Sequence, residues 1–114
     1  MKKTRNAAKS TPTEFYVVSW AEKDDNNKSL TSGTFMDIYS TARKARNAVK
    51  ATIVENMKDI IERHYPDAVE RFGTDDPKEL ARLMVVEDTA GYIKTEWETE
   101  CQYIITKYST KYIK

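Results

Sequence analysis

The chain of 114 residues is long enough for one hydrophobic core and too short for two, so we expect a single domain. Its 39% hydrophobic and 32% charged residues are typical of a folded domain with a charged surface and exclude an intrinsically disordered chain. A net charge of +1 excludes a highly acidic mimic of DNA, and no apolar run approaches the roughly 18 residues of a membrane span.

The first residues carry charge but no apolar segment of the kind that a signal peptide needs. Residues 1–13 are polar, basic and aperiodic, so we expect a flexible basic tail followed by one folded domain over residues 14–114. The single cysteine, Cys101, cannot form an internal disulfide. We therefore expect a reduced, cytoplasmic location.

The first predicted elements are two strands. Residues 14–21 contain the run FYVVSW, whose β-branched and aromatic residues favour a strand. Alternation places Phe15 and Val17 on one face of this strand. Its other face carries three further side chains, those of Tyr16, Val18 and Trp20. Turn formers over residues 24–28 and a weaker strand over residues 29–36 complete a predicted β-hairpin.

Residues 40–64 form the longest predicted helix. Its apolar side chains recur every three to four positions, at Ala42, Ala45, Val49, Ile53, Met57, Ile60 and Ile61. Ser40 or Thr41 is the expected N-cap, with Asp37 as the cap of an earlier start. Pro66 is expected to end the helix one or two residues earlier, because the residue before a proline leaves the helical conformation.

A second helix is predicted after a single helical turn over residues 67–73. Asp76 is the expected N-cap, Pro77 occupies the first helical position, and Glu79 is the expected capping-box partner. This helix is expected to run to about Val86. Its buried side chains are predicted to be Leu80, Leu83 and Met84.

The end of the chain predicts a second hairpin. The secondary structure of residues 85–88 stays undecided, since the two valines there either end the preceding helix or begin a strand. Residues 92–97 and 100–108 are predicted strands, with the turn at Glu98 and Thr99. The last strand places Tyr103 and Ile105 on one face. Its other face carries Ile104 and Tyr108.

The order strand, strand, long helix, short helix, strand, strand predicts an α+β fold. The simplest arrangement is a two-layer sandwich, in which a four-stranded, largely antiparallel sheet (β-β-α-α-β-β) carries one long and one short helix on one face. The other face of the sheet is then open to solvent or to a partner.

Enzyme chemistry has no constellation of residues to support it. The only histidine, His64, lies at the predicted end of the long helix, where it is expected to cap backbone carbonyls. Cys101 has no neighbouring base or helix start that would lower its pKa. The three glycines are isolated, which excludes a glycine-rich phosphate loop. We expect a non-catalytic protein without cofactor or metal.

Binding is the favoured function. Small aromatic-rich domains are typical of accessory proteins of phages or mobile elements, which act by stoichiometric binding, and we expect an intracellular protein-interaction module of this kind. The expected partner is another protein or a second copy of this chain, and we expect no binding to a membrane. Five aromatic residues are candidates for an interface on the open sheet face, namely Tyr16, Trp20, Tyr92, Trp97 and Tyr103. The opposing expectation is that Trp20 and Trp97 fill the core.

Nucleic-acid binding is the alternative function. The basic N-terminal arm and the basic start of the long helix would contact phosphates, through Lys2, Lys3, Arg5, Arg43, Lys44, Arg46 and Lys50. Basic side chains in the first turns of a helix interact unfavourably with the positive end of the helix dipole. A bound anion would offset this unfavourable interaction.

One stretch resembles a known DNA-binding family. The pattern from FYVVSW through GTF to STARKA loosely resembles the DNA-binding arm domain of tyrosine recombinases, over about a third of the chain, and this resemblance implies DNA binding. The pattern departs from a DNA-binding hairpin at Glu22, Asp24 and Asp25, which are acidic. We therefore do not assign the family.

Overall fold

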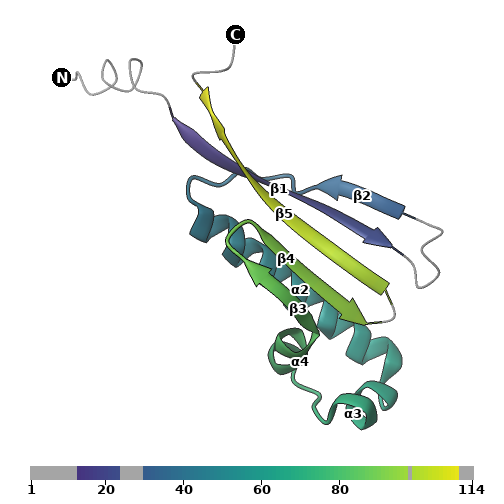
Figure 1. Cartoon of the computed structure of the whole chain (residues 1–114). Helices are drawn as coiled ribbons and strands as arrows, with labels where there is room; N and C mark the ends of the chain where they lie inside the picture. Colours follow the sequence, from purple (N-terminus) through teal and green to yellow (C-terminus); the bar gives the residue numbers. More distant parts are fainter. Residues whose placement is uncertain (1–12, 24–29, 98, 111–114) are drawn as a thin grey trace.

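The computed structural model describes residues 13–23, 30–97 and 99–110 (Figure 1). It is an α+β fold in which one antiparallel sheet carries helices on one side. The elements in chain order are β1 (Glu14–Lys23), β2 (Leu30–Thr34), α2 (Ala42–His64), α3 (Asp67–Phe72), α4 (Pro77–Met84), β3 (Val85–Thr89), β4 (Tyr92–Trp97) and β5 (Thr99–Ser109). The predicted tail lies outside the described residues, apart from Thr13.

The sheet has five strands in the order β2-β1-β5-β4-β3, not the four predicted. The two predicted hairpins are present and join through β1 and β5, which pair in register from Glu14↔Ser109 to Lys23↔Glu100. The fifth strand, β3, pairs with β4 and begins directly at the C-cap of α4. The prediction of helix through Val86 was wrong, because the β-branched pair Val85-Val86 adopts the extended backbone that it favours.

The start and end of α2 confirm its predicted caps. Thr41 is the N-cap, and its Oγ1 accepts a hydrogen bond of 3.1 Å from the backbone N–H of Lys44. The helix ends at His64, since Tyr65 has the extended backbone that Pro66 imposes. Side chains four positions apart form its buried face, which consists of Ala45, Val49, Ile53 and Met57.

The start of α4 was predicted correctly, and its buried face was predicted correctly at Leu80 and Met84 but not at Leu83. Asp76 caps the helix, with its Oδ1 accepting from Lys78 N–H at 3.2 Å, and Pro77 follows. Glu79 pairs with Arg82 and makes no capping box. Leu83 is 47% exposed, because α4 presents its other side to the core. The side chains that α4 buries are those of Leu80, Ala81 and Met84.

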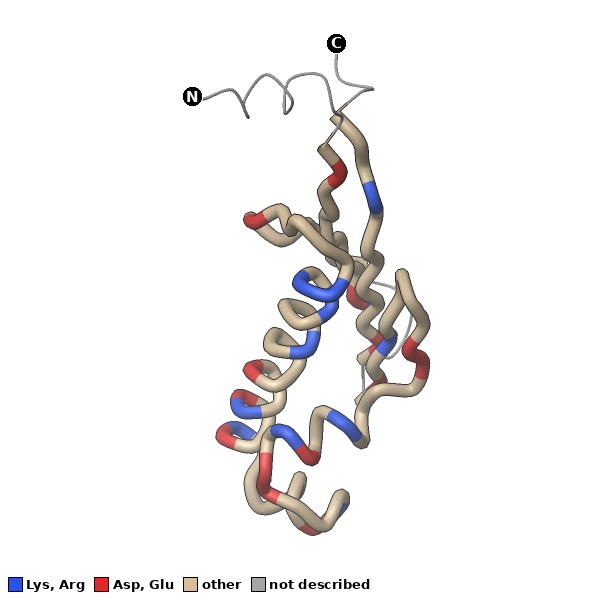
Figure 2. Tube along the Cα trace, turned by 90° about the vertical axis from the view of Figure 1, so that its left-hand side faces the viewer, with Lys and Arg blue, Asp and Glu red and all other residues tan. Residues whose placement is uncertain are grey.

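Figures 1 and 2 show the two layers. In Figure 1 α2 passes behind β4 and β5, and the view turned by 90° in Figure 2 separates the helical layer from the sheet. The core lies between the layers, where Val18 and Ile93 of the sheet meet Ile53 of α2. No helix in the described part of the chain combines the length and the apolar character needed to cross a membrane.

Candidate binding surfaces

The sheet does not bring the five candidate aromatic residues together on its open face. Tyr103 is 2% exposed and belongs to the core, and three more of the five pack against that core, namely Tyr16, Trp20 and Trp97. Trp20 and Tyr103 are register partners and therefore share the helix side. Only Tyr92, whose register partner is Ile104, lies on the open face. The alternation of side chains between the two faces was predicted correctly. The placement of Tyr16, Trp20, Trp97 and Tyr103 on the open face was wrong, because these four side chains lie on the helix side.

The open face carries a different apolar group, which we call the open-face patch. It consists of Phe15, Val17, Tyr92, Ile104 and Tyr108. The rings of Phe15 and Tyr108 stack with centroids 5.6 Å apart. Ile104 is 42% and Tyr108 is 49% exposed, so the patch presents apolar surface to solvent.

The other end of the open face is polar and internally paired. Lys94 Nζ lies 3.4 Å from Glu96 Oε2 and 3.5 Å from Glu100 Oε1, and Gln102 donates to Glu100 Oε2 at 2.6 Å. Burial alone would lower the pKa of Lys94, but the hydrogen bonds and charges of Glu96 and Glu100 raise it above its ordinary value. The hydrogen bond from Gln102 lowers the pKa of Glu100. Lys94 is therefore paired within one copy, and together with Glu96 and Glu100 it leaves one net negative charge.

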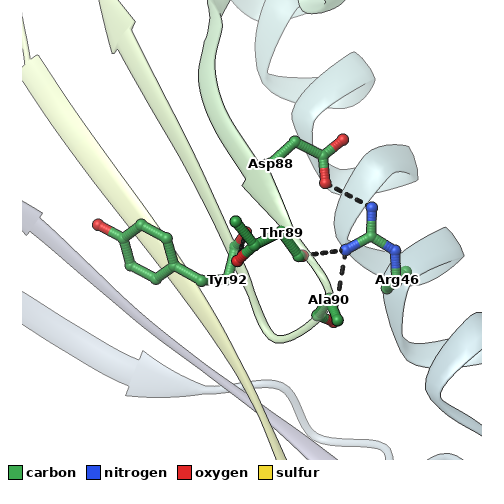
Figure 3. Close-up of polar contacts among 5 residues, drawn as sticks. All are labelled: Arg46, Asp88, Thr89, Ala90 and Tyr92. Carbon is green, nitrogen blue, oxygen red and sulfur yellow. Dashed lines mark hydrogen bonds and ion pairs between the residues drawn. The ribbon is translucent and has the colours of Figure 1, made fainter.

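The predicted anion-binding set is divided by the structure. Lys2, Lys3 and Arg5 lie outside the described residues. Arg46 is engaged with the β3–β4 turn (Figure 3), where Nη2 contacts Asp88 Oδ1 at 2.5 Å and Nη1 donates to the backbone oxygen of Thr89 at 2.5 Å. Its guanidinium is thus a structural tie between α2 and the turn.

The other bases of this set lie on the outer side of α2. Lys44 Nζ donates to Ser40 Oγ at 3.1 Å. Arg43 and Lys50 are exposed and form no ion pair with any residue that the structure describes. Lys50 borders a groove between α2 and α4 that Lys78 and Arg82 also line. Figure 2 shows the resulting row of blue positions along α2.

A cavity of about 390 Å³ lies between α2 and the sheet. Trp20, Cys101, Tyr103, Thr95 and Trp97 line it from the sheet, and Asn56, Met57 and Ile60 line it from α2. Asn56 Nδ2 donates to Tyr103 Oη at 3.3 Å across the cavity wall. Three of the candidate aromatics are therefore brought together here, around a site that the sequence pattern did not indicate.

Burial favours the neutral forms of two side chains of this cavity, those of Cys101 and Tyr103. Burial raises the pKa of the Cys101 thiol, against the effect of its hydrogen bond with Tyr103, and the charge of Glu22 raises it further. Burial likewise raises the pKa of Tyr103. The thiol is therefore a weak nucleophile at neutral pH.

Trp97, which lines the cavity, also packs against α3 and the end of α2. Its ring centroid lies 5.1 Å from that of His64 and 6.3 Å from that of Phe72, and the Arg71 guanidinium carbon lies 5.8 Å from it. The Trp97 indole N–H is buried and has no hydrogen-bond partner among the residues that the structure describes. His64 therefore packs on an aromatic ring, whereas the sequence suggested a role in capping carbonyls.

Within residues 13–23, 30–97 and 99–110, no three His, Cys, Asp or Glu side chains are grouped to hold a metal ion. No protein-family model, curated protein or solved structure matches this chain. The arrangement of its own surfaces is therefore the basis for assigning a function.

Proposed function

We propose that the protein is a non-catalytic interaction module whose open sheet face binds a second copy of the chain. The observation that carries this proposal is the open-face patch, where apolar side chains of β1, β4 and β5 lie together on a sheet side that none of the described helices covers. Two such sheets would stack face to face about 10 Å apart, as the layers of a β-sandwich do. An isologous pairing brings each patch against its own copy.

The size of the face suits a dimer. The ten registered pairs of β1 and β5 span about 33 Å, and five strands are about 19 Å wide, which gives a projected face of at most about 600 Å². Side-chain relief increases the accessible area of such a face. The result approaches the roughly 800 Å² that each partner contributes to a standard interface.

The charges of the open face also suit a second copy. Lys94 lies between Glu96 and Glu100, so the lysine of this cluster is already paired within one copy. The patch itself contains no charged side chain, so two copies do not bring like charges together there. A partner with a strongly charged surface would gain little at this face.

A pair of matched substitutions tests the proposal. Ile104→Lys places a charge in the patch, whereas Leu83→Lys places the same charge at an equally apolar and similarly exposed position of α4. We expect sedimentation equilibrium to show a dimer for the wild type and Leu83→Lys and a monomer for Ile104→Lys. A wild type that stays monomeric at several hundred micromolar, or equal effects of the two substitutions, would refute the proposed dimer.

Nucleic-acid binding stays the second candidate, because Arg43 and Lys50 are exposed and unpaired in the described part of the chain and Lys78 and Arg82 lie near Lys50. If this candidate holds, DNA or RNA affinity falls steeply with salt, and Arg43→Ala lowers it. Glu79 pairs with Arg82 and reduces the positive charge of this surface. Absence of binding to random DNA and RNA at low salt would exclude it.

A further inference from the structure

The cavity between α2 and the sheet has the chemistry of a site for a small organic cation. Its volume of about 390 Å³ lies in the range of small-molecule pockets. Four aromatic side chains from different segments line it, those of Trp20, Phe35, Trp97 and Tyr103. Aromatic faces attract ammonium groups through their quadrupoles, and cages of such rings recognise quaternary ammonium ions.

The charges around the cavity leave one carboxylate uncompensated. Asp59 is paired with Arg63 at 2.6 Å, and Glu96 contacts Lys94 at 3.4 Å. Glu22 has no cation within ion-pair distance among the residues that the structure describes. Its carboxylate accepts a hydrogen bond from Thr99 Oγ1 at 3.3 Å.

Glu22 lies on the helix side of the sheet, the side that faces the cavity. Its register partner on β5 is Cys101, which also lines the cavity, and two residues further along each strand Trp20 pairs with Tyr103. The carboxylate thus stands at the rim, while the rings lie around the interior. This arrangement offers a counter-ion and an apolar enclosure to the same ligand.

We propose that this cavity binds a small organic monocation of the alkylammonium class, with its apolar groups among the aromatic rings and its charge facing Glu22. Asn56 and Tyr103, already joined by a hydrogen bond, supply polar atoms for a hydroxyl or amide of the ligand. An anionic ligand would be repelled by Glu22. The site is independent of the open-face patch, because it lies on the opposite side of the sheet.

Choline and its neutral isostere 3,3-dimethylbutan-1-ol test the proposal. Trp20 and Trp97 are the two tryptophans of the chain and both line the cavity, so their fluorescence reports occupancy directly. At constant ionic strength we expect a saturable fluorescence change with choline and an affinity for the isostere that is weaker by about 5- to 30-fold, since that factor corresponds to one cation–π contact with a nearby counter-ion.

Two carboxylate variants complete the experiment. Glu22→Gln is expected to reduce choline affinity toward that of the isostere without reaching it, because the aromatic rings still attract the cation. Glu87→Gln, on the edge strand β3, is expected to leave choline affinity unchanged. No saturable change up to about 50 mM choline, which corresponds to about 2 kcal/mol of binding free energy, would overturn the proposal. Equal affinity for choline and the isostere, or equal effects of the two variants, would overturn it as well.

Discussion

Replacing Arg46 should destabilise the protein, because its guanidinium joins α2 to the β3–β4 turn. In Arg46→Met the apolar stem stays, but the contact with Asp88 and the hydrogen bond to Thr89 O are lost. A hydrogen bond from a charged group contributes about 1.5 to 3 kcal/mol, and a partly exposed ion pair adds at most about 1 kcal/mol. With the Arg46 side chain 23% exposed, we expect a loss of about 2 kcal/mol. This corresponds to a fall in melting temperature of about 8 °C.

Arg43→Met is the matched control. Arg43 lies three positions earlier on α2, is exposed and makes no ion pair with a described residue, so its replacement should change stability by less than about 0.5 kcal/mol. Urea unfolding of both variants would compare their stabilities. Adding Asp88→Asn and the double variant Arg46→Met with Asp88→Asn would measure the coupling between Arg46 and Asp88. Equal stability of Arg43→Met and Arg46→Met would show that the tie in Figure 3 does not stabilise the fold.

Ile53→Ala, at a buried position of α2, should lower the free energy of unfolding in urea by about 2 to 5 kcal/mol, whereas Leu83→Ala should lower it by less than about 1 kcal/mol. Similar losses for the two variants would contradict the assigned core. Thr41→Ala removes the N-cap of α2 and should cost about 1 kcal/mol, more than Ser40→Ala does, and the reverse order would contradict the cap. The Cys101 thiol should react with a disulfide reagent at pH 8 at least about tenfold more slowly than glutathione. Its rate should rise through pH 9, because burial raises its pKa, and a rate equal to that of glutathione would disprove this.

The helices were predictable because their signals are local. The caps Thr41 and Asp76 lie directly before the helices that they begin, and Pro66 lies two residues after the end of α2. The strand β3 was left open, because Val85-Val86 suits either state and its pairing with β4 decides between them. The tie from Arg46 to Asp88 joins residues far apart in the sequence, so no local pattern indicated it.

The faces of the sheet were predictable only in part. Alternation correctly grouped Phe15 with Val17, and Ile104 with Tyr108, but both sides of β1 carry aromatic or β-branched residues. Which side is buried depends on where α2 docks, and α2 docks over Val18. The aromatic set predicted for the interface therefore divides between the core and the cavity, and only Tyr92 is on the open face.

Light scattering across a concentration series tests the central claim most directly. A dimer held by the open-face patch predicts a mass that rises with concentration from 13.2 kDa to twice that value and stays there. The same series with Ile104→Lys should stay at 13.2 kDa. A wild-type mass that remains at 13.2 kDa up to several hundred micromolar would contradict the claim that a second copy covers this face.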